Sequence, residues 1–202
     1  GAADLLSGEL DEMKRLKYAG LLRRGVDRIT DMTQELLEYA RGTTQLEFEK
    51  VSPRILIAEL EEEVLRPLTG AGIQVHFAIG FDDPIRVDRR RFFRVLHNIV
   101  KNAAEAMPQG GTITITVEAM DDRAVFRVAD TGVGIPPEVL PTIFEPFVSH
   151  GKAGGTGLGM AIVHSVVEAH GGTILVESTP GEGTSFTIAI PIADQPAIEM
   201  EA

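Results

Sequence analysis

Apolar residues recur at three- and four-residue steps along residues 4–41, and this spacing predicts a long amphipathic helix. The apolar stripe consists of Leu6, Leu10, Met13, Leu22, Val26, Ile29, Met32, Leu36 and Ala40. An isolated helix cannot bury such a stripe by itself. We therefore expect a partner helix, most simply from a second copy of the chain. Packing back onto the downstream residues is the alternative.

After residue 45 the pattern changes to short alternating segments that are separated by helical ones. Alternation predicts strands over 46–51, 73–79, 112–118, 123–129, 173–178 and 184–190. Helical spacing predicts helices over 53–69, 138–143 and 158–169, and a further helix that begins after Asp88. Ser52 and Asp88 are the expected N-caps, because their side chains can accept hydrogen bonds from N–H groups of the first turn.

The composition is ordinary for a soluble globular chain, with 44% apolar and 24% charged residues. A net charge of −11 argues against a general nucleic-acid surface. The chain has no cysteine, which excludes disulfides and cysteine-bound zinc. No apolar run approaches the roughly 18 residues of a membrane span. We therefore expect a cytoplasmic setting and no membrane contact by this chain.

The first stretch whose residues could bind a ligand is Asp130-Thr-Gly-Val-Gly-Ile135, which follows an expected apolar strand. An ionised carboxylate only accepts hydrogen bonds, so Asp130 could accept one from an amino group such as that of adenine. Gly132 and Gly134 would let a flat ring approach the main chain. A tight turn without any ligand explains the same residues, and this stretch alone leaves both interpretations open.

Polar side chains also recur on the helix after Asp88. Asn98, Asn102 and Glu105 stand at i, i+4 and i+7 and so share one face. Buried amides need hydrogen-bond partners, and a structural amide network is one explanation. The other is that the carbonyl of Asn102 binds Mg²⁺, which takes few protein ligands and keeps waters and phosphate oxygens.

A second glycine cluster, 154–159, opens the helix expected over 158–169. Free N–H groups at a helix N-terminus attract phosphate. The cluster matches neither the dinucleotide fingerprint nor the P-loop. His150 and Lys152 precede it, and Lys152 could reach a terminal phosphate or simply be solvated.

Four segments in this order resemble the ATP-binding domain of sensor histidine kinases. They are Asn98–Ala103, Asp130–Ile135, Phe144–Phe147 and Gly155–Met160, which are similar to the asparagine, first glycine, phenylalanine and second glycine boxes of that family. The amino-acid sequence of these segments looks most like that of the nitrogen-regulator subgroup. The resemblance covers residues 46–192. It also reaches the long helix, which looks like the second helix of the family's dimerising hairpin.

The resemblance implies an α+β fold, a two-layer α/β sandwich of the Bergerat type, preceded by a long dimerisation-type helix. The implied domains are a partial hairpin over 1–45, a catalytic ATP-binding domain over 46–192 and a flexible tail over 193–202. The implied cofactors are ATP and Mg²⁺. The implied partners are a response regulator and a second copy of the chain, bound through residues 4–41.

The resemblance also implies roles for individual residues. Asp130 would bind the adenine amine, Asn102 would hold Mg²⁺, and Asn98 and Lys152 would act in catalysis at the phosphates. The remaining residues of the implied nucleotide site are Gly132, Gly134, Ile135, Phe144, Phe147, His150, Gly155, Thr156, Gly157, Leu158 and Gly159. Related ATP hydrolases carry a general-base glutamate at the position of Asn98, and an amide cannot take a proton from water.

The sequence departs from the family at two points. Glu105 stands where many members carry a lysine. No histidine precedes His76, so the phosphoacceptor expected on the hairpin is absent. Because the matching segment starts abruptly within the hairpin, we expect that the chain is cut from a longer protein, and without the acceptor histidine we expect that it cannot phosphorylate itself. The alternatives are phosphorylation in trans, a degenerate scaffold that binds a response regulator, a superfamily ATPase, or a serine kinase.

Overall fold

The computed structural model describes residues 14–23, 25–26, 30, 33, 46–69, 72–148 and 156–192. The chain divides into two compact units, residues 1–41 and 42–202. In the first unit every described residue is helical. Leu16, Leu21, Leu22 and Val26 of this helix are exposed. The rest of the helix expected over 4–41 and the expected tail over 193–202 lie outside the described residues.

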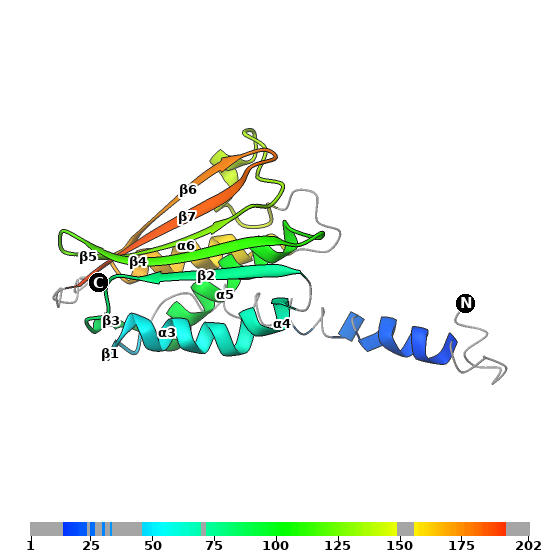
Figure 1. The fold of residues 1–202 in the computed structure, drawn as a ribbon, viewed down its shortest axis with the longest axis horizontal. Helices are drawn as coiled ribbons and strands as arrows, with labels where there is room; N and C mark the ends of the chain where they lie inside the picture. The colour runs from blue at the N-terminus through cyan, green and yellow to red at the C-terminus, as the bar shows by residue number, and fades with distance from the viewer. Residues whose placement is uncertain are drawn as a thin grey trace, which may run out of the picture. The chain divides into compact units, whose positions relative to one another are not determined.

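The second unit is built on a five-stranded sheet with the order β2-β4-β5-β7-β6 (Figure 1). Its strands are β2 (Ile73–Ile79), β4 (Gly111–Met120), β5 (Arg123–Asp130), β6 (Thr173–Thr179) and β7 (Gly183–Pro191). β2 pairs with β4 in parallel and the other pairs are antiparallel, so the sheet is mixed. A separate antiparallel pair joins β1 (Glu49–Val51) to β3 (Ile85–Val87). The periodicity did not predict β3, which is only a short strand.

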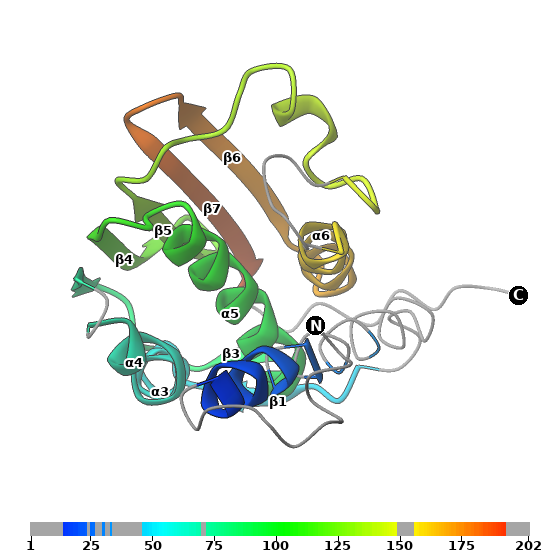
Figure 2. The same cartoon turned by 90° about the vertical axis from the view of Figure 1, so that its right-hand side faces the viewer.

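The helices of this unit lie on one side of the five-stranded sheet (Figures 1 and 2), which confirms the two-layer α+β fold. They are α3 (Pro53–Leu60), the π-helical turn η1 (Glu61–Leu65), α4 (Arg66–Thr69), α5 (Arg89–Glu105) and α6 (Gly159–Ala169). The prediction of a helix that spans 138–143 is wrong. That segment contains only the 3₁₀ turn η2 (Leu140–Thr142), since Pro141 has no N–H to donate to an α-helix.

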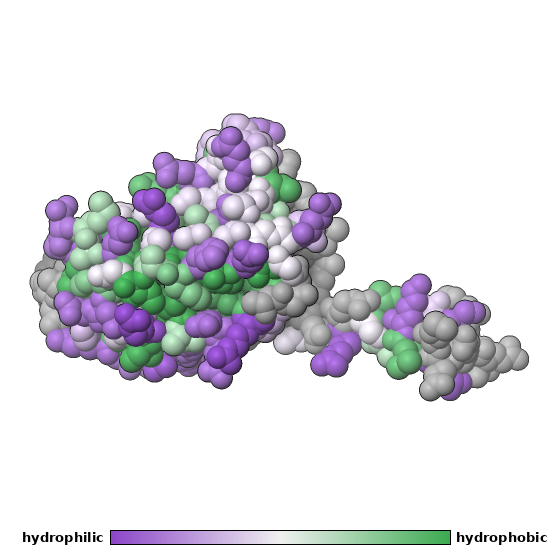
Figure 3. All heavy atoms as spheres, viewed as in Figure 1, coloured by the Kyte–Doolittle hydropathy of each residue, from purple (hydrophilic) through white to green (hydrophobic). Residues whose placement is uncertain are grey.

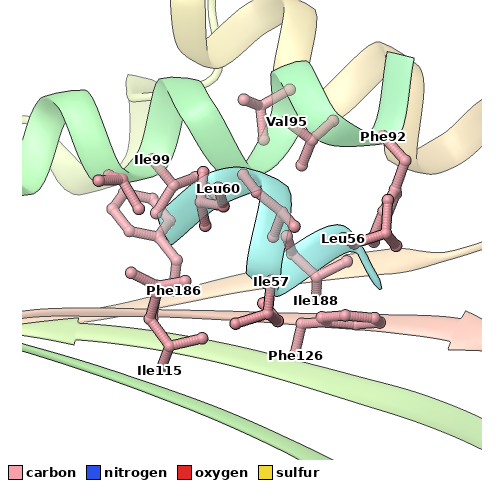
Figure 4. Close-up of a cluster of buried hydrophobic side chains, with 14 of the residues drawn as sticks. Leu56, Ile57, Leu60, Phe92, Val95, Ile99, Ile115, Phe126, Phe186 and Ile188 are labelled. Carbon is pink, nitrogen blue, oxygen red and sulfur yellow. The ribbon is translucent and has the colours of Figure 1, made fainter. Parts of the chain in front are cut away.

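The hydrophobic core fills the space between the helices and the sheet (Figure 4). It includes an edge-to-face pair of Phe92 on α5 and Phe126 on β5, with ring centroids 5.1 Å apart. The fully or nearly fully buried residues labelled around this pair are Leu56, Ile57, Leu60, Val95, Ile99, Ile115, Phe186 and Ile188. The core therefore ties α3 and α5 to the same inner face of the sheet.

The two expected N-caps have different outcomes. Asp88 caps α5, because its Oδ1 accepts a hydrogen bond from the N–H of Arg91 at 3.0 Å. Ser52 precedes α3, but its side chain makes no cap bond. Its hydroxyl donates instead to Asp82, and Asp82 Oδ1 accepts from the N–H of Arg54 at 2.9 Å. A carboxylate distant in sequence therefore supplies the cap of α3.

The surface of the second unit carries mixed charged and apolar residues (Figure 3). Arg89 pairs with Glu59 at 3.1 Å, and Arg91 lies 3.6 Å from Asp88, so part of the basic run on α5 pairs locally. Phe77 on the edge strand β2 is 38% exposed, so this edge keeps an apolar side chain at the surface. Within the described ranges, no helix is both long and apolar enough to cross a membrane.

The burial of α3 predicts a clear difference between its two faces. Leu60→Ala should lower the free energy of unfolding by about 2–5 kcal/mol, because it opens a cavity at a fully buried position. Ile55→Ala on the same helix is the matched control, since Ile55 is 50% exposed, and it should change stability by about 0.5 kcal/mol or less. Urea denaturation of both variants measures this difference, and equal losses would contradict the packing described.

Candidate functional site

Asp130, the last residue of β5, is a buried carboxylate with 9% of its surface exposed. It points to the helix side because its strand alternates, with Phe126 and Val128 buried on the same face. Its Oδ1 accepts hydrogen bonds from the N–H groups of Gly132 at 2.8 Å and Thr184 at 3.3 Å. Among the described residues no hydrogen bond ends on Oδ2. One oxygen is therefore held by the backbone and the other is left able to accept a further bond.

The environment of Asp130 sets its charge preference. Burial raises the pKa of the Asp130 carboxyl, while the N–H groups of Gly132 and Thr184 act in the opposite direction. Burial is the largest of these effects, so the ionised form carries a desolvation cost in the folded protein. A ligand that donates a hydrogen bond to Oδ2 would offset part of this cost.

The glycines after Asp130 are required by contacts within the protein. A Cβ on Gly132 would lie 2.7 Å from the Cβ of Ala106 on α5. Gly134 has a φ of +71°, and its Cβ would lie 2.3 Å from the carbonyl oxygen of Thr179. These contacts alone account for glycine at positions 132 and 134, whether or not a flat ring binds beside them. They let the turn press against α5 on one side and against the β6–β7 turn on the other.

Two polar residues beside Asp130 were not predicted from the sequence. Thr184 is 6% exposed, and its hydroxyl lies 3.0 Å from that of Ser178. Ser178 in turn accepts a hydrogen bond from the N–H of Ile135 at 2.8 Å. Both occupy inward-facing positions of otherwise apolar strands, and that break in the alternation was the available signal. Together they fix the predicted site residue Ile135 to the sheet.

The polar face of α5 faces both glycine segments. Asn98 Nδ2 donates to the carbonyl oxygen of Gly159 at 3.4 Å. Two turns further along, the carbonyl oxygen of Ala106 accepts from the N–H of Val133 at 3.1 Å. Asn102 lies one turn from each of these contacts, so its position is between the start of α6 and the turn after Asp130. Glu105 is exposed and does not extend this half-buried face.

The N-terminus of α6 has no side-chain cap among the described residues. Its N-cap, Leu158, is buried and provides no side-chain cap bond. The first-turn N–H groups of an α-helix have no partner within the helix and carry a partial positive charge. Among the described residues, a Cβ on Gly159 would meet only Asn98 Nδ2, at 4.0 Å. Unlike Gly132 and Gly134, Gly159 therefore has no packing contact that excludes a side chain.

Phe147 and Gly157 lie against each other just before α6. The N–H of Phe147 donates to the carbonyl oxygen of Gly157 at 2.9 Å. Both residues have positive φ, +67° and +70°, and a Cβ on Gly157 would lie 2.5 Å from the carbonyl carbon of Phe147. Phe144 packs on His164 of α6 with ring centroids 5.2 Å apart. The structure thus brings Phe147 and Gly157 to the start of α6 and Phe144 to the middle of that helix.

Some predicted site residues cannot be placed. His150, Lys152 and Gly155 lie outside the described residues, whereas the hydroxyl of Thr156 accepts from the N–H of Leu158 at 3.2 Å. Within the described part of the chain, no cluster of three or more His, Cys, Asp or Glu side chains could hold a metal ion.

Comparison with known proteins matches this architecture to one family. Residues 87–194 match the family described as histidine kinase-, DNA gyrase B-, and HSP90-like ATPase. The chain is 36% identical over 177 residues to the sensor histidine kinase ZraS of Escherichia coli (strain K12), which is 87% of this chain and 38% of ZraS. The chain thus spans well under half the length of that relative.

Two solved structures share the fold over nearly the whole chain. Full-length ShkA in complex with AMPPNP has a TM-score of 0.78 and 30% identity, covering 95% of this chain and 41% of that one. Histidine kinase ThkA in complex with response regulator protein TrrA has a TM-score of 0.77 and 29% identity, covering 96% of this chain and 56% of that one. These likenesses agree with the fold class expected from the sequence.

The different surroundings of two glycines predict opposite effects of alanine. Gly134→Ala should lower the free energy of unfolding by at least about 1–3 kcal/mol, because its positive φ and its contact with Thr179 both exclude a Cβ. Gly159→Ala should leave stability within about 1 kcal/mol of the parent or raise it, since alanine favours the helix. Thermal and urea unfolding test the pair. A large loss for Gly159→Ala would show that packing requires this glycine as well.

Proposed function

The chain belongs to the histidine kinase-, DNA gyrase B-, and HSP90-like ATPase family, and from this premise we propose that residues 46–192 bind ATP and transfer its γ-phosphate to a histidine side chain. Its ATPase domain is of the type found in two-component sensor kinases. The observation that carries the proposal is the buried Asp130 carboxylate, which has one oxygen held by the backbone and one left to accept. The histidine kinase activity rests on the names of relatives that are longer than this chain.

Asp130 is proposed to recognise adenine through its exocyclic amine. The N–H groups of Gly132 and Thr184 fix the carboxylate through Oδ1, so its orientation is set before a ligand binds. Oδ2 is then an acceptor of fixed direction in a largely dry environment, where a hydrogen bond to a charged group is worth about 1.5–3 kcal/mol. Thr184 and Ser178 support this arrangement from the sheet. The proposal therefore assigns base recognition to the end of β5.

The phosphates are proposed to lie between α5 and the start of α6. The uncapped first turn of α6 offers N–H donors and the positive end of the helix dipole. Gly159 leaves space beside Asn98, and no described contact demands a glycine there. Gly157 and Phe147 fix the backbone that leads into this turn. Lys152 and His150, which lie outside the described residues, are proposed to approach the phosphates from the preceding segment.

Asn102 is proposed to hold Mg²⁺ through its side-chain carbonyl. Its place on α5, one turn from both Asn98 and Ala106, is between the two glycine segments. Magnesium is usually held by one or two protein oxygens together with water and phosphate oxygens, which fits a site without a carboxylate cluster. When bound, the ion would neutralise charge on the phosphates.

The residues on α5 favour transfer to a nitrogen nucleophile over hydrolysis. A neutral imidazole attacks phosphorus with the lone pair of its unprotonated nitrogen, the P–O bond to the leaving group breaks, and ADP departs. The proton on the other ring nitrogen can pass to solvent after the transfer. This step needs no side chain to remove a proton from the nucleophile. Water does need such a base, and Asn98 is an amide that cannot serve as one. Catalysis then rests on positioning and on electrostatic stabilisation.

The partners of the chain are proposed from its first unit and from one structural neighbour. Leu16, Leu21, Leu22 and Val26 expose an apolar set on the helix, which favours a second copy of the chain as its partner. ThkA is known in complex with a response regulator protein. We extend a partner of that class, and a cytoplasmic setting, to this chain.

Asp130→Asn should weaken ATP binding by roughly 10- to 100-fold while preserving the fold. The asparagine oxygen can replace Oδ1, but its NH₂ group then meets the adenine amine, and two donors repel. Stability at neutral pH should be equal or higher, because the variant removes a buried carboxylate whose pKa is raised by burial. Calorimetric titration with ATP and Mg²⁺, together with urea unfolding, measures both effects.

The matched control is Asp121→Asn, at the turn before β5. Asp121 is exposed and has a φ of 54°, which asparagine also tolerates. It should bind ATP as the parent does. Unchanged affinity of Asp130→Asn would contradict the proposed base recognition. No measurable affinity of the parent at millimolar ATP would favour a degenerate scaffold.

A separate helical hairpin fragment with an acceptor histidine should become labelled when it is mixed with this chain and γ-labelled ATP. The product should be acid-labile, as expected for phosphohistidine, and the chain alone should gain no such label. At ATP concentrations below the dissociation constant of the parent, Asp130→Asn should lower the labelling by roughly the same 10- to 100-fold factor. Release of inorganic phosphate without acceptor would instead indicate an ATP hydrolase, and an acid-stable product would indicate a serine kinase.

A further inference from the structure

His170 is a buried imidazole at the carboxyl end of α6, the opposite end of that helix from the candidate site. Its Nε2 accepts a hydrogen bond from the backbone N–H of Asp88 at 2.9 Å. Its Nδ1 lies 2.7 Å from the carbonyl oxygen of Val166. A backbone N–H can only donate, so Nε2 must be the acceptor and Nδ1 must carry the proton. Both ring nitrogens are therefore satisfied only in the neutral ring.

The contact between His170 and Asp88 joins three parts of the fold. Asp88 begins α5 as its N-cap, and His170 ends α6 as its C-cap. Asp88 Oδ2 also accepts from the N–H of Glu47 at 3.1 Å. The next residue, Phe48, packs edge-on against the imidazole with ring centroids 5.3 Å apart. The residues that lead into β1 are thus fastened to the same point as the two helix ends.

A second contact connects the same two helices at the site itself, where Asn98 donates to the Gly159 carbonyl. We call this hydrogen bond and the one between Asp88 and His170 the two ties between α5 and α6. Because Asp88 meets His170 and Asn98 meets Gly159, α5 and α6 run in opposite directions between the two ties. Each tie is separated from the other by about 15–16 Å of helix at a rise of 1.5 Å per residue. Regular helices resist changes of length, so an axial shift at one tie moves the other. The site contact is long, at 3.4 Å, and is the weaker of the two.

We propose, on the basis of the nucleotide site proposed above, that His170 is a positioning residue for that site. It fixes the axial register of α6 against α5 and thereby the spacing between Asn98 and the N-terminus of α6. It does so without touching the nucleotide. Phe48 packs on the same imidazole. A movement of the segment around Phe48 would therefore be passed through His170 to the axial position of α6 against α5.

The surroundings of His170 decide when the tie holds. Burial is the main cause that lowers the pKa of His170, and the guanidinium of Arg91 lowers it further, whereas the Val166 carbonyl and the Asp88 carboxylate act in the opposite direction. The charged groups on the elements packed around the ring are Asp88, Arg91, Glu47, Arg86 over the Phe48 ring and Arg123 at the carbonyl of Gly171. Protonated Nε2 would face the N–H of Asp88, donor against donor. The tie is therefore kept at neutral pH and lost in acid.

Two substitutions in the full chain distinguish the effect of the His170 hydrogen bond from the effect of its ring packing. His170→Phe keeps a ring but leaves the N–H of Asp88 without an acceptor, and it should weaken ATP binding by about tenfold. His170→Gln offers an amide oxygen near the position of Nε2 and should stay within about threefold of the parent. Val117→Ala, at a fully buried position of β4 that takes part in neither tie, controls for general loss of stability. It should bind ATP like the parent even if it is less stable than His170→Phe.

The pH dependence adds a readout that a purely structural role would not move. The ratio of ATP affinities, parent over His170→Gln, cancels the titration of ATP and of Asp130. It should be constant from pH 8 to about 6.5, the ordinary value for histidine, and fall at lower pH as the parent loses its tie. Stability follows the same sign: a histidine pKa lowered by folding contributes stability above about 6.5 that is lost as pH falls.

Each outcome decides one question. Equal ATP affinity of His170→Phe and the parent, or a ratio that rises as the pH falls below about 6.5, would show that His170 serves stability alone and would overturn the inference. Equal weakening by Val117→Ala would overturn it too. Absence of ATP binding by the parent would refute the proposed function itself, and with it the site that His170 is inferred to position.

Discussion

A carboxylate kept out of water at the end of β5 is the interaction on which the rest of the site depends. Burial disfavours the charge of Asp130, and only the N–H groups of Gly132 and Thr184 offset this cost within the described residues. These donors require the turn after β5 to fold sharply and β7 to lie alongside. A Cβ on Gly183 would lie 1.9 Å from the carbonyl oxygen of Asp130, so even this strand pairing needs a glycine. The binding chemistry is therefore built into the sheet.

The sequence predicted those elements whose pattern is local. Residues 89–105 and 159–169 are helices of the expected kind, and the strand that ends at Asp130 is where alternation placed it. The errors arose where distant residues decide. The cap of α3 comes from Asp82 and not from Ser52, because a carboxylate brought there by the fold is the better acceptor for the N–H of Arg54. No periodicity in the neighbourhood of Ser52 carries that information.

The site shows the same division between local and long-range information. Spacing placed Asn98 and Asn102 on one face, and the contact of Asn98 with Gly159 agrees with it. The spacing of residues in the sequence could not show which glycines the packing of the fold requires and which it does not. Thr179, some 45 residues away, excludes a side chain at Gly134, whereas the described residues leave only Asn98 Nδ2, at 4.0 Å, near a Cβ on Gly159. A glycine that costs helix stability and relieves no described contact is the stronger candidate for a ligand's neighbour.

The arrangement of α5 and α6 also explains why such a site should be sensitive to residues far from it. Its polar groups come from the middle of one helix, the start of another and the end of a strand, so their spacing is set by how these elements pack and not by any loop. Packed interiors do not deform continuously. A change at the opposite helix ends, where Asp88, His170 and Phe48 meet, must then be absorbed by the weakest contact in the pair. That contact is the one between Asn98 and Gly159, and affinity for a ligand held there should change before the fold does.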